Sequence, residues 1–318
     1  MFIDLQTVIN RLSEKDNIVI LLHQSPDGDT IGCGYSLYFA LKKLGKNARV
    51  ECADKIGDRY SYITENAQFS EFVPEFVVAV DVADIKLLGS KAQEYNTIDL
   101  CIDHHPSNCD WAKETYVDAS AAAACEILYE VVLGLCGDVD YNQALALYTG
   151  ISTDTGCFKF TNTTSKTHKI AAILMEKGIN YGEINRIMFE TKTKGRLLVE
   201  RKALNSIKFI CDDKVAIMTI TKEMREESGA DDSELEGITS LPRTIEGVLL
   251  GITIREREEN VCKISARTHE PISASGFCAL FGGGGHERAA GCEIKKSVQE
   301  AFCDLEKAAI DTLLKAGF

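Results

Sequence analysis

The stretch NIVILLHQSPDGD, residues 17–29, decides the fold class. Its first seven residues form a continuous apolar run that ends at His23, which predicts a strand buried on both faces. A tight loop with Asp27 and Asp29 then leads into residues 30–44, which have helical apolar spacing and end before Gly45. A buried strand that runs directly into a helix is typical of a parallel α/β sheet.

The alternation of strands and helices continues along the first part of the chain. Strand-like runs cover residues 48–52, 76–80 and 98–102, and helical patterns cover residues 1–15, 85–95, 125–135, 142–151, 167–177 and 180–190. We therefore predict a parallel sheet covered by helices on both faces.

The second part of the chain changes character. Residues 214–221, 248–255 and 261–267 read as strands, the last two around a polar turn at 256–260. A glycine run, a short strand at 291–294 and a helix at 298–314 follow. We expect an α/β domain over residues 1–190, a linker over 191–206, part of which can also be helical, and a smaller α/β domain over 207–318.

Composition limits where the protein works and what it binds. The chain has 318 residues, of which 45% are hydrophobic and 26% charged, which suits two folded domains. No segment approaches the roughly 18 consecutive apolar residues that span a bilayer, and residues 1–10 lack the basic cluster of a secretory signal. The 12 cysteines include no C-x-x-C pair, so we interpret them as small buried side chains in a reducing compartment. We expect a cytoplasmic protein without a membrane partner.

The formal net charge of −13 argues against a long nucleic acid as the partner. An acidic surface repels a polyanion and lacks the basic stripe of a duplex-binding protein. A nucleic-acid partner should therefore be short. A homodimer through apolar helices is conceivable, but residues 125–135 and 142–151 fit a core better.

Residues that ligate metals follow several of the predicted elements. His23, Asp27 and Asp29 follow the first strand, and the remaining candidates end or follow later elements: Asp81, Asp103, His104, His105 and Asp154. Each acid has an ordinary alternative, since Asp27 or Asp29 can cap the next helix and Asp81 or Asp154 can belong to a turn. Independent caps and turns would not place imidazoles and carboxylates at every ligand-binding edge, so we favour a metal site.

These motifs resemble the DHH superfamily of phosphoesterases. The resemblance is carried by HQSPDGD (23–29), AVDVAD (79–84), IDHHPSN (102–108) and STDTGCFKFTNTT (152–164), and GGGGHERAAG (282–291) looks like the signature of a DHHA1 domain. The resemblance covers nearly the whole chain. In its length and in both signatures the chain is similar to small bacterial proteins that act as oligoribonucleases and phosphatases of 3′-phosphoadenosine 5′-phosphate (pAp).

The resemblance implies a site for two divalent ions, most often manganese. His23, Asp27 and Asp81 would hold one ion, and Asp29, Asp81, His104 and Asp154 the other, with Asp81 bridging. His105, with Asp103, would act on the substrate side, although either histidine of the pair can be the ligand. Two such ions about 3.5–4 Å apart can share a hydroxide and stabilise attacking and leaving oxygens.

The second domain is expected to bind the rest of the substrate. The resemblance assigns a phosphate contact to Arg267, and the backbone of Gly283, Gly284 and Gly285 before His286 can approach a phosphate closely. A flexible glycine linker is the alternative. The expected activity is the manganese-dependent hydrolysis of short RNA and of pAp to AMP and phosphate. Hydrolysis of cyclic di-AMP or pApA, hydrolysis of pyrophosphate, and a catalytically silent nucleotide sensor remain the rival hypotheses.

Overall fold

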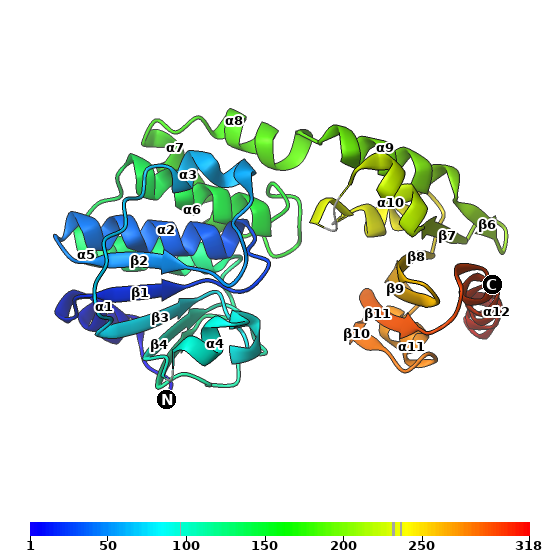
Figure 1. Ribbon diagram of the computed structural model, residues 1–318, viewed down its shortest axis with the longest axis horizontal. Coiled ribbons are helices and arrows are strands. Elements are labelled where there is room, and N and C mark those ends of the chain that lie inside the picture. The colour runs from blue at the N-terminus through cyan, green and yellow to red at the C-terminus, as the bar shows by residue number, and fades with distance from the viewer. Residues whose placement is uncertain (96, 231–232, 236) are drawn as a thin grey trace. The chain divides into compact units, whose positions relative to one another are not determined.

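The computed structural model describes residues 1–95, 97–230, 233–235 and 237–318, and the chain divides into two compact units. The first unit is Met1–Thr191 and the second is Lys192–Phe318 (Figure 1). The expected linker at 191–206 is mostly helix α9 (Lys194–Asn205), which falls within the second unit.

A five-stranded parallel sheet forms the centre of the first unit, in the order β2-β1-β3-β4-β5. Its strands are β1 (Ile18–Leu21), β2 (Ala48–Glu51), β3 (Phe76–Val80), β4 (Leu100–Asp103) and β5 (Glu114–Val117). Every residue of β1 and β3 is buried, because helices and loops cover both faces of the sheet. The edge strand β5 was not expected from the sequence.

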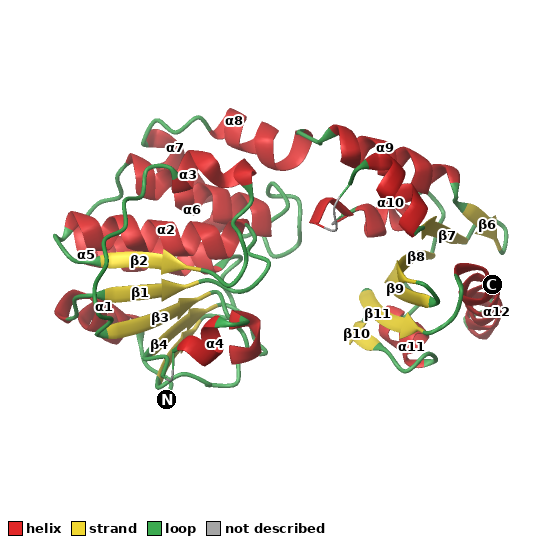
Figure 2. Ribbon diagram, in the orientation of Figure 1, coloured by secondary structure: helices red, strands yellow, loops and turns green. Residues whose placement is uncertain are grey.

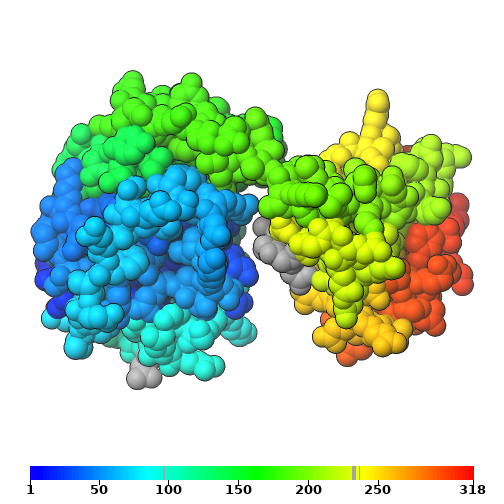
Figure 3. All heavy atoms as spheres, turned by 45° about the horizontal axis from the view of Figure 1, so that its top comes forward, coloured from blue at the N-terminus to red at the C-terminus, as the bar shows by residue number. Residues whose placement is uncertain are grey.

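Most of the helices of the first unit pack on one face of this sheet (Figure 2). They are α1 (Leu5–Glu14), α2 (Gly28–Lys43), η1 (Asp58–Tyr60), α3 (Ser61–Thr64), α5 (Ala124–Cys136), α6 (Tyr141–Asp154), α7 (Ser165–Glu176), α8 (Tyr181–Asn185) and the π-helix η3 (Arg186–Glu190). The segments after residue 165 form part of the outer surface of this unit, drawn in green in Figure 3.

The opposite face carries a thinner layer. The single helix expected at residues 85–95 is instead two short ones, η2 (Ile85–Leu88) and α4 (Lys91–Glu94). Gly89 separates them with a φ of 57°, a conformation that ends a helix and that glycine adopts without strain.

Glycines allow helices α2 and α6 to pack closely beside the sheet. A Cβ atom on Gly32 would lie 2.5 Å from the carbonyl oxygen of Ala146, and one on Gly150 would lie 2.8 Å from Oδ1 of Asp29. Close backbone approach of this kind requires glycine. It brings the first turn of α2 beside the end of α6, where two of the expected metal ligands lie.

The second unit is built on a mixed six-stranded sheet, in the order β10-β11-β9-β8-β7-β6. Its strands are β6 (Lys208–Ile210), β7 (Val215–Ile220), β8 (Leu250–Glu258), β9 (Val261–Thr268), β10 (Gly284–His286) and β11 (Ala289–Ile294). Strands β8 and β9 extend further than expected, so their turn comprises only residues 259–260, with Asn260 at a φ of 59°.

Helices cover both faces of this second sheet. Helices α11 (Ala274–Ala279) and α12 (Val298–Lys315) pack on one face, and α9, α10 (Lys222–Ser228), η4 (Ser233–Leu235) and η5 (Ile238–Thr244) belong to the other side. Among all described residues, no helix is long and apolar enough to cross a membrane.

Candidate metal centre and substrate face

The candidate metal ligands of the first unit meet at one edge of its sheet. Strand β1 ends at Leu21, β3 at Val80 and β4 at Asp103, and the carboxyl ends of parallel strands share an edge. The side chains that follow these strands, together with Asp154 at the end of α6, lie close together in two groups, His23–Asp27–Asp81 and Asp29–His104–Asp154, with Asp81 also near His104. The structure thus brings together all six residues expected as ligands.

Two histidines have the same arrangement on opposite sides of Asp81. The Nδ1 atom of His23 lies 2.8 Å from the carbonyl oxygen of Gln24, and Nδ1 of His104 lies 3.2 Å from that of Ala121. A proton on Nδ1 donated to a carbonyl leaves the Nε2 lone pair free for a metal. In both side chains Nε2 is therefore the nitrogen that could bind a metal.

Both Nε2 atoms face carboxylates at distances too long for a hydrogen bond. Nε2 of His23 lies 3.6 Å from Oδ1 of Asp27 and 3.7 Å from Oδ2 of Asp81. Nε2 of His104 lies 3.6 Å from Oδ1 of Asp81, 3.8 Å from Oδ2 of Asp154 and 3.9 Å from Oδ2 of Asp29. Such spacings leave room for an ion to be bound between the groups.

Asp81 occupies the centre of this arrangement and is only 3% exposed. One oxygen of its carboxylate faces His23 and the other faces His104, so a single side chain serves both groups. Its Oδ1 atom is buried and has no hydrogen-bond partner, and its backbone has a φ of 58°. Burial, followed by the charges of Asp29 and Asp27, raises the pKa of Asp81 well above its ordinary value.

Asp27 has the cap role that the sequence left open, and its position also suits the other role, that of a metal ligand. It is the N-cap of α2, where its Oδ1 accepts hydrogen bonds from the backbone N–H groups of Asp29 and Thr30 at 3.0 and 3.2 Å. The same carboxylate faces His23. A carboxylate has enough lone pairs to cap a helix and still hold an ion.

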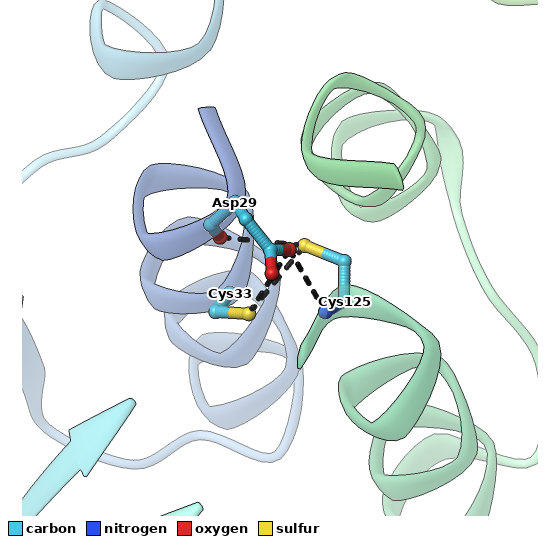
Figure 4. Close-up of side chains that lie close together, drawn as sticks. All are labelled: Asp29, Cys33 and Cys125. Atoms are coloured by element: carbon cyan, nitrogen blue, oxygen red, sulfur yellow. Dashed lines mark hydrogen bonds between the residues drawn. The ribbon is translucent and has the colours of Figure 1, made fainter. Parts of the chain in front are cut away.

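Asp29 is fixed by the N-terminus of a second helix (Figure 4). Its Oδ2 accepts a hydrogen bond from the N–H of Ala124 at 2.6 Å and its Oδ1 from the N–H of Cys125 at 3.0 Å. The buried thiols of Cys33 and Cys125 lie 3.5 Å from each other beside it. The start of α5 thus orients a carboxylate that belongs to α2.

The charge at this edge favours a cation. Burial and then the charges of Asp29 and Asp27 raise the pKa of Asp154 from 3.8 to about 8. Among the described residues, no lysine or arginine pairs with Asp27, Asp29, Asp81 or Asp154, whose side-chain ion-pair partners are imidazoles. Mixed imidazole and carboxylate donors suit manganese, iron or zinc better than calcium, and the unpartnered oxygen of Asp81 fits a ligand position.

The second unit places Arg267 and His286 on one face of its sheet. Arg267 of β9 is opposite Ala289 of β11, which is opposite His286 of β10. The glycine run is not a flexible linker, because Gly284 and Gly285 belong to β10.

The three glycines before His286 differ in their surroundings. A Cβ on Gly283 would lie 2.3 Å from the carbonyl oxygen of Gly291, and one on Gly285 would lie 2.7 Å from Cα of Ala290. A Cβ on Gly284 would meet nothing within 4 Å. Close packing of the strands therefore explains Gly283 and Gly285, whereas Gly284 leaves open space.

Comparison with known proteins identifies the family. Residues 17–151 match the DHH family N-terminal domain and residues 212–315 match the DHHA1 domain. The chain is 31% identical over 309 residues to the bifunctional oligoribonuclease and PAP phosphatase NrnA of Thermus thermophilus, covering 95% of this chain and 91% of that protein. The chain belongs to the DHH family of phosphoesterases. The NrnA protein of Bacillus subtilis is 26% identical over 296 residues, covering 90% of this chain and 92% of that protein.

A solved structure has a similar fold. An exopolyphosphatase-related protein from Bacteroides fragilis superimposes with a TM-score of 0.84 at 25% identity, covering 95% of each chain. The family match and this structure agree with the predicted α/β fold.

The two histidines of the triplet that gives the DHH family its name have different contacts in this chain. His104 faces the carboxylates, whereas Nδ1 of His105 lies 2.7 Å from Oδ1 of Asp103. Asn108 donates a hydrogen bond to Oδ2 of Asp103 at 2.8 Å, which holds the carboxylate in place. The hydrogen bond that His105 donates to Asp103 raises the pKa of His105. The role of Asn108 was not predicted, although it lies within the motif at 102–108.

Proposed function

We propose that this protein is a cytoplasmic, manganese-dependent phosphoesterase that hydrolyses short oligoribonucleotides from an end and converts pAp to AMP and phosphate. The observation that carries the proposal is Asp81, whose two carboxylate oxygens face His23 and His104 separately and whose Oδ1 has no hydrogen-bond partner. The activities that the NrnA relatives are named for support the choice of substrate.

The proposed ligand sets share Asp81. His23, Asp27 and Asp81 would hold one ion, and Asp29, Asp81, His104 and Asp154 would hold the other. Four aspartates carry four negative charges, which two divalent ions neutralise, so a phosphate can enter despite the net charge of −13. When bound, such ions would stabilise the charge that develops on the phosphate and lower the pKa of a water nucleophile.

We assign hydrogen bonding and proton transfer in the first unit to His105 and Asp103. His105 is 42% exposed at its side chain, and its Nδ1 is held by Asp103. We assign its free Nε2 to the substrate side, where it would hydrogen-bond a phosphate oxygen or protonate the leaving oxygen. Asp103 acts by orienting this ring and by favouring its protonated form.

We further propose that residues 1–190 form the catalytic domain, and residues 207–318 the domain that binds the rest of the substrate through Arg267 and His286. A guanidinium offers a planar fork that suits phosphate oxygens. The open space above Gly284 would let a phosphate approach the backbone of β10.

The test is hydrolysis of pAp and of a ladder of short RNAs by the purified protein, with manganese and with chelator. We expect AMP from pAp and mononucleotides from the shortest RNAs, both lost in chelator and in Asp81→Asn. Arg257→Gln, on an exposed part of β8, serves as an active control. Turnover of cyclic di-AMP or pyrophosphate in place of both substrates would contradict the proposal.

A further inference from the structure

One row of residues crosses four strands of the second sheet. Gly251 of β8 is opposite Arg267 of β9, Arg267 is opposite Ala289 of β11, and Ala289 is opposite His286 of β10. Residues directly opposite each other in a sheet point to the same face. Arg267 and His286 therefore share a face, with only the small side chain of Ala289 between them.

The neighbouring row on this face also lacks large side chains. It consists of Thr253, Ser265, Gly291 and Gly284, in the same strand order. The alternate residues, such as Ile252, Ile264 and Ala290, point into the apolar core on the other face. Between Arg267 and His286 the face thus has a floor of small residues, open above Gly284.

The glycine at the end of the first row brings a second arginine to this face. A Cβ on Gly251 would lie 2.7 Å from the backbone nitrogen of Arg243 and 3.0 Å from Cβ of Pro242. Helix η5 thus crosses β8 where Gly251 leaves room, and the hydroxyl of Thr253 fixes it by donating to the carbonyl oxygen of Thr239 at 3.0 Å. Arg243 is consequently held beside Arg267.

Neither arginine is neutralised by an acid. Arg267 donates from Nη1 to the carbonyl oxygen of Ala266 at 3.0 Å, and in the described part of the chain no carboxylate pairs with Arg267 or Arg243. Both are half-buried. Burial and then the charge of Arg243 lower the pKa of Arg267, so the two cations repel each other.

Arg243 remains accessible to a ligand. It lines an open surface pocket of about 530 Å³ together with residues 244–249 and His269. The acid in this lining is Glu246, which forms no ion pair with Arg243. Two adjacent, half-buried guanidiniums that repel each other are stabilised by an anion that binds both.

We propose that Arg243 joins Arg267 in a two-arginine clamp for the terminal phosphomonoester of a short nucleotide, which makes the enzyme prefer phosphate-ended over hydroxyl-ended substrates. A terminal phosphate carries close to two negative charges, matching two guanidiniums, whereas an internal diester carries one. The clamp rests on the proposed function, because its ligand is part of the proposed substrate. Arg243 is a specificity determinant and takes no part in bond breaking.

Equilibrium binding tests the clamp without any hydrolysis. AMP and adenosine are titrated into the full-length, metal-free protein in chelator. We expect AMP to bind more tightly than adenosine, and Arg243→Gln to weaken AMP by about 10–100-fold while leaving adenosine unchanged. Arg243→Lys keeps the charge without the fork and should lose less. Arg257→Gln, also on β8 but outside the row, should match the wild type.

Turnover gives a second and separable result. With manganese, Arg243→Gln should raise KM for pApA toward that of ApA and leave kcat and the turnover of ApA unchanged. Equal binding of AMP by wild type and Arg243→Gln, or equal loss of AMP and adenosine, overturns the clamp. If neither RNA nor pAp is hydrolysed while Arg243 still discriminates AMP from adenosine, the clamp stands and the proposed function fails.

Discussion

Replacing Asp81 by asparagine should abolish activity and at the same time stabilise the metal-free protein. The substitution keeps the size of the side chain and removes its charge. Asparagine also tolerates the backbone φ of 58° better than most residues do, so the change should not strain the chain. The two effects have opposite signs because the carboxylate would bind the ions, whereas without them its Oδ1 has no hydrogen-bond partner.

The size of the stabilisation follows from the surroundings of Asp81. A buried polar atom without a partner costs about 1–3 kcal/mol, and a charged one costs more. The neighbouring carboxylates Asp29, Asp27, Asp103 and Asp154 add repulsion. A gain of about 1–3 kcal/mol corresponds to a rise in melting temperature of roughly 2–10 °C for a domain of this size.

The assay is thermal unfolding of wild type and Asp81→Asn at pH 8, in chelator and with added manganese. In chelator the variant should melt at the higher temperature. With manganese the order should reverse, because the wild type binds the ions and the variant binds them poorly. A variant that melts lower than the wild type in chelator would refute the reasoning that Asp81 is held in the fold at a cost in stability.

Three further predictions test neighbouring features. Gly150→Ala should lower the free energy of unfolding by about 1–3 kcal/mol and weaken manganese binding, because its Cβ would lie 2.2 Å from Sγ of Cys125 and 2.8 Å from Oδ1 of Asp29. The stability of the metal-free protein should fall as the pH rises from about 4 to about 8. The reason is that the pKa of Asp154 is raised from 3.8 to about 8, so the folded state binds the proton of Asp154 more tightly than the unfolded state does. Thermal unfolding over this pH range measures the fall. Asn108→Ala should lower kcat by about 10–100-fold with little change in manganese affinity, because Asn108 holds the Asp103 carboxylate that orients His105. Steady-state kinetics measure kcat, and a metal titration measures the affinity.

Each of these predictions has a clear contradicting result. Gly182→Ala, whose Cβ would meet only Oδ1 of Asn180 at 3.7 Å, is the control for Gly150→Ala and should be neutral or stabilising. Stability that rises with pH in chelator would contradict the pKa of Asp154. Loss of manganese in Asn108→Ala would mean that Asn108 supports the ligands and not His105.

The strands that precede the candidate ligands could be predicted from the sequence because their residues are strongly apolar. Residues 18–22 of the first run and residues 76–80 are apolar throughout, and such runs belong to strands buried on both faces. Strand β5 was missed because only one of its four residues is buried, so ETYV has no apolar run to detect. The helix expected at 85–95 was wrong because Gly89 interrupts a pattern that is otherwise helical.

Part of the site depends on contacts between distant segments, which a single sequence does not display. The start of α5 orients Asp29 through the N–H groups of Ala124 and Cys125, about a hundred residues along the chain. Gly251 and Arg243 meet only because η5 crosses β8. Motifs identified the residue types of the site, but packing decided which groups support them.

We propose that Asp81 joins two ion sites into one centre. Equilibrium dialysis against manganese, followed by electron paramagnetic resonance of the loaded protein, tests it most directly. We predict two ions per chain with a spin-coupled spectrum in the wild type, and loss of the coupled signal in Asp81→Asn. Binding of a single ion per chain, or an uncoupled spectrum from two ions in the active wild type, would contradict the claim.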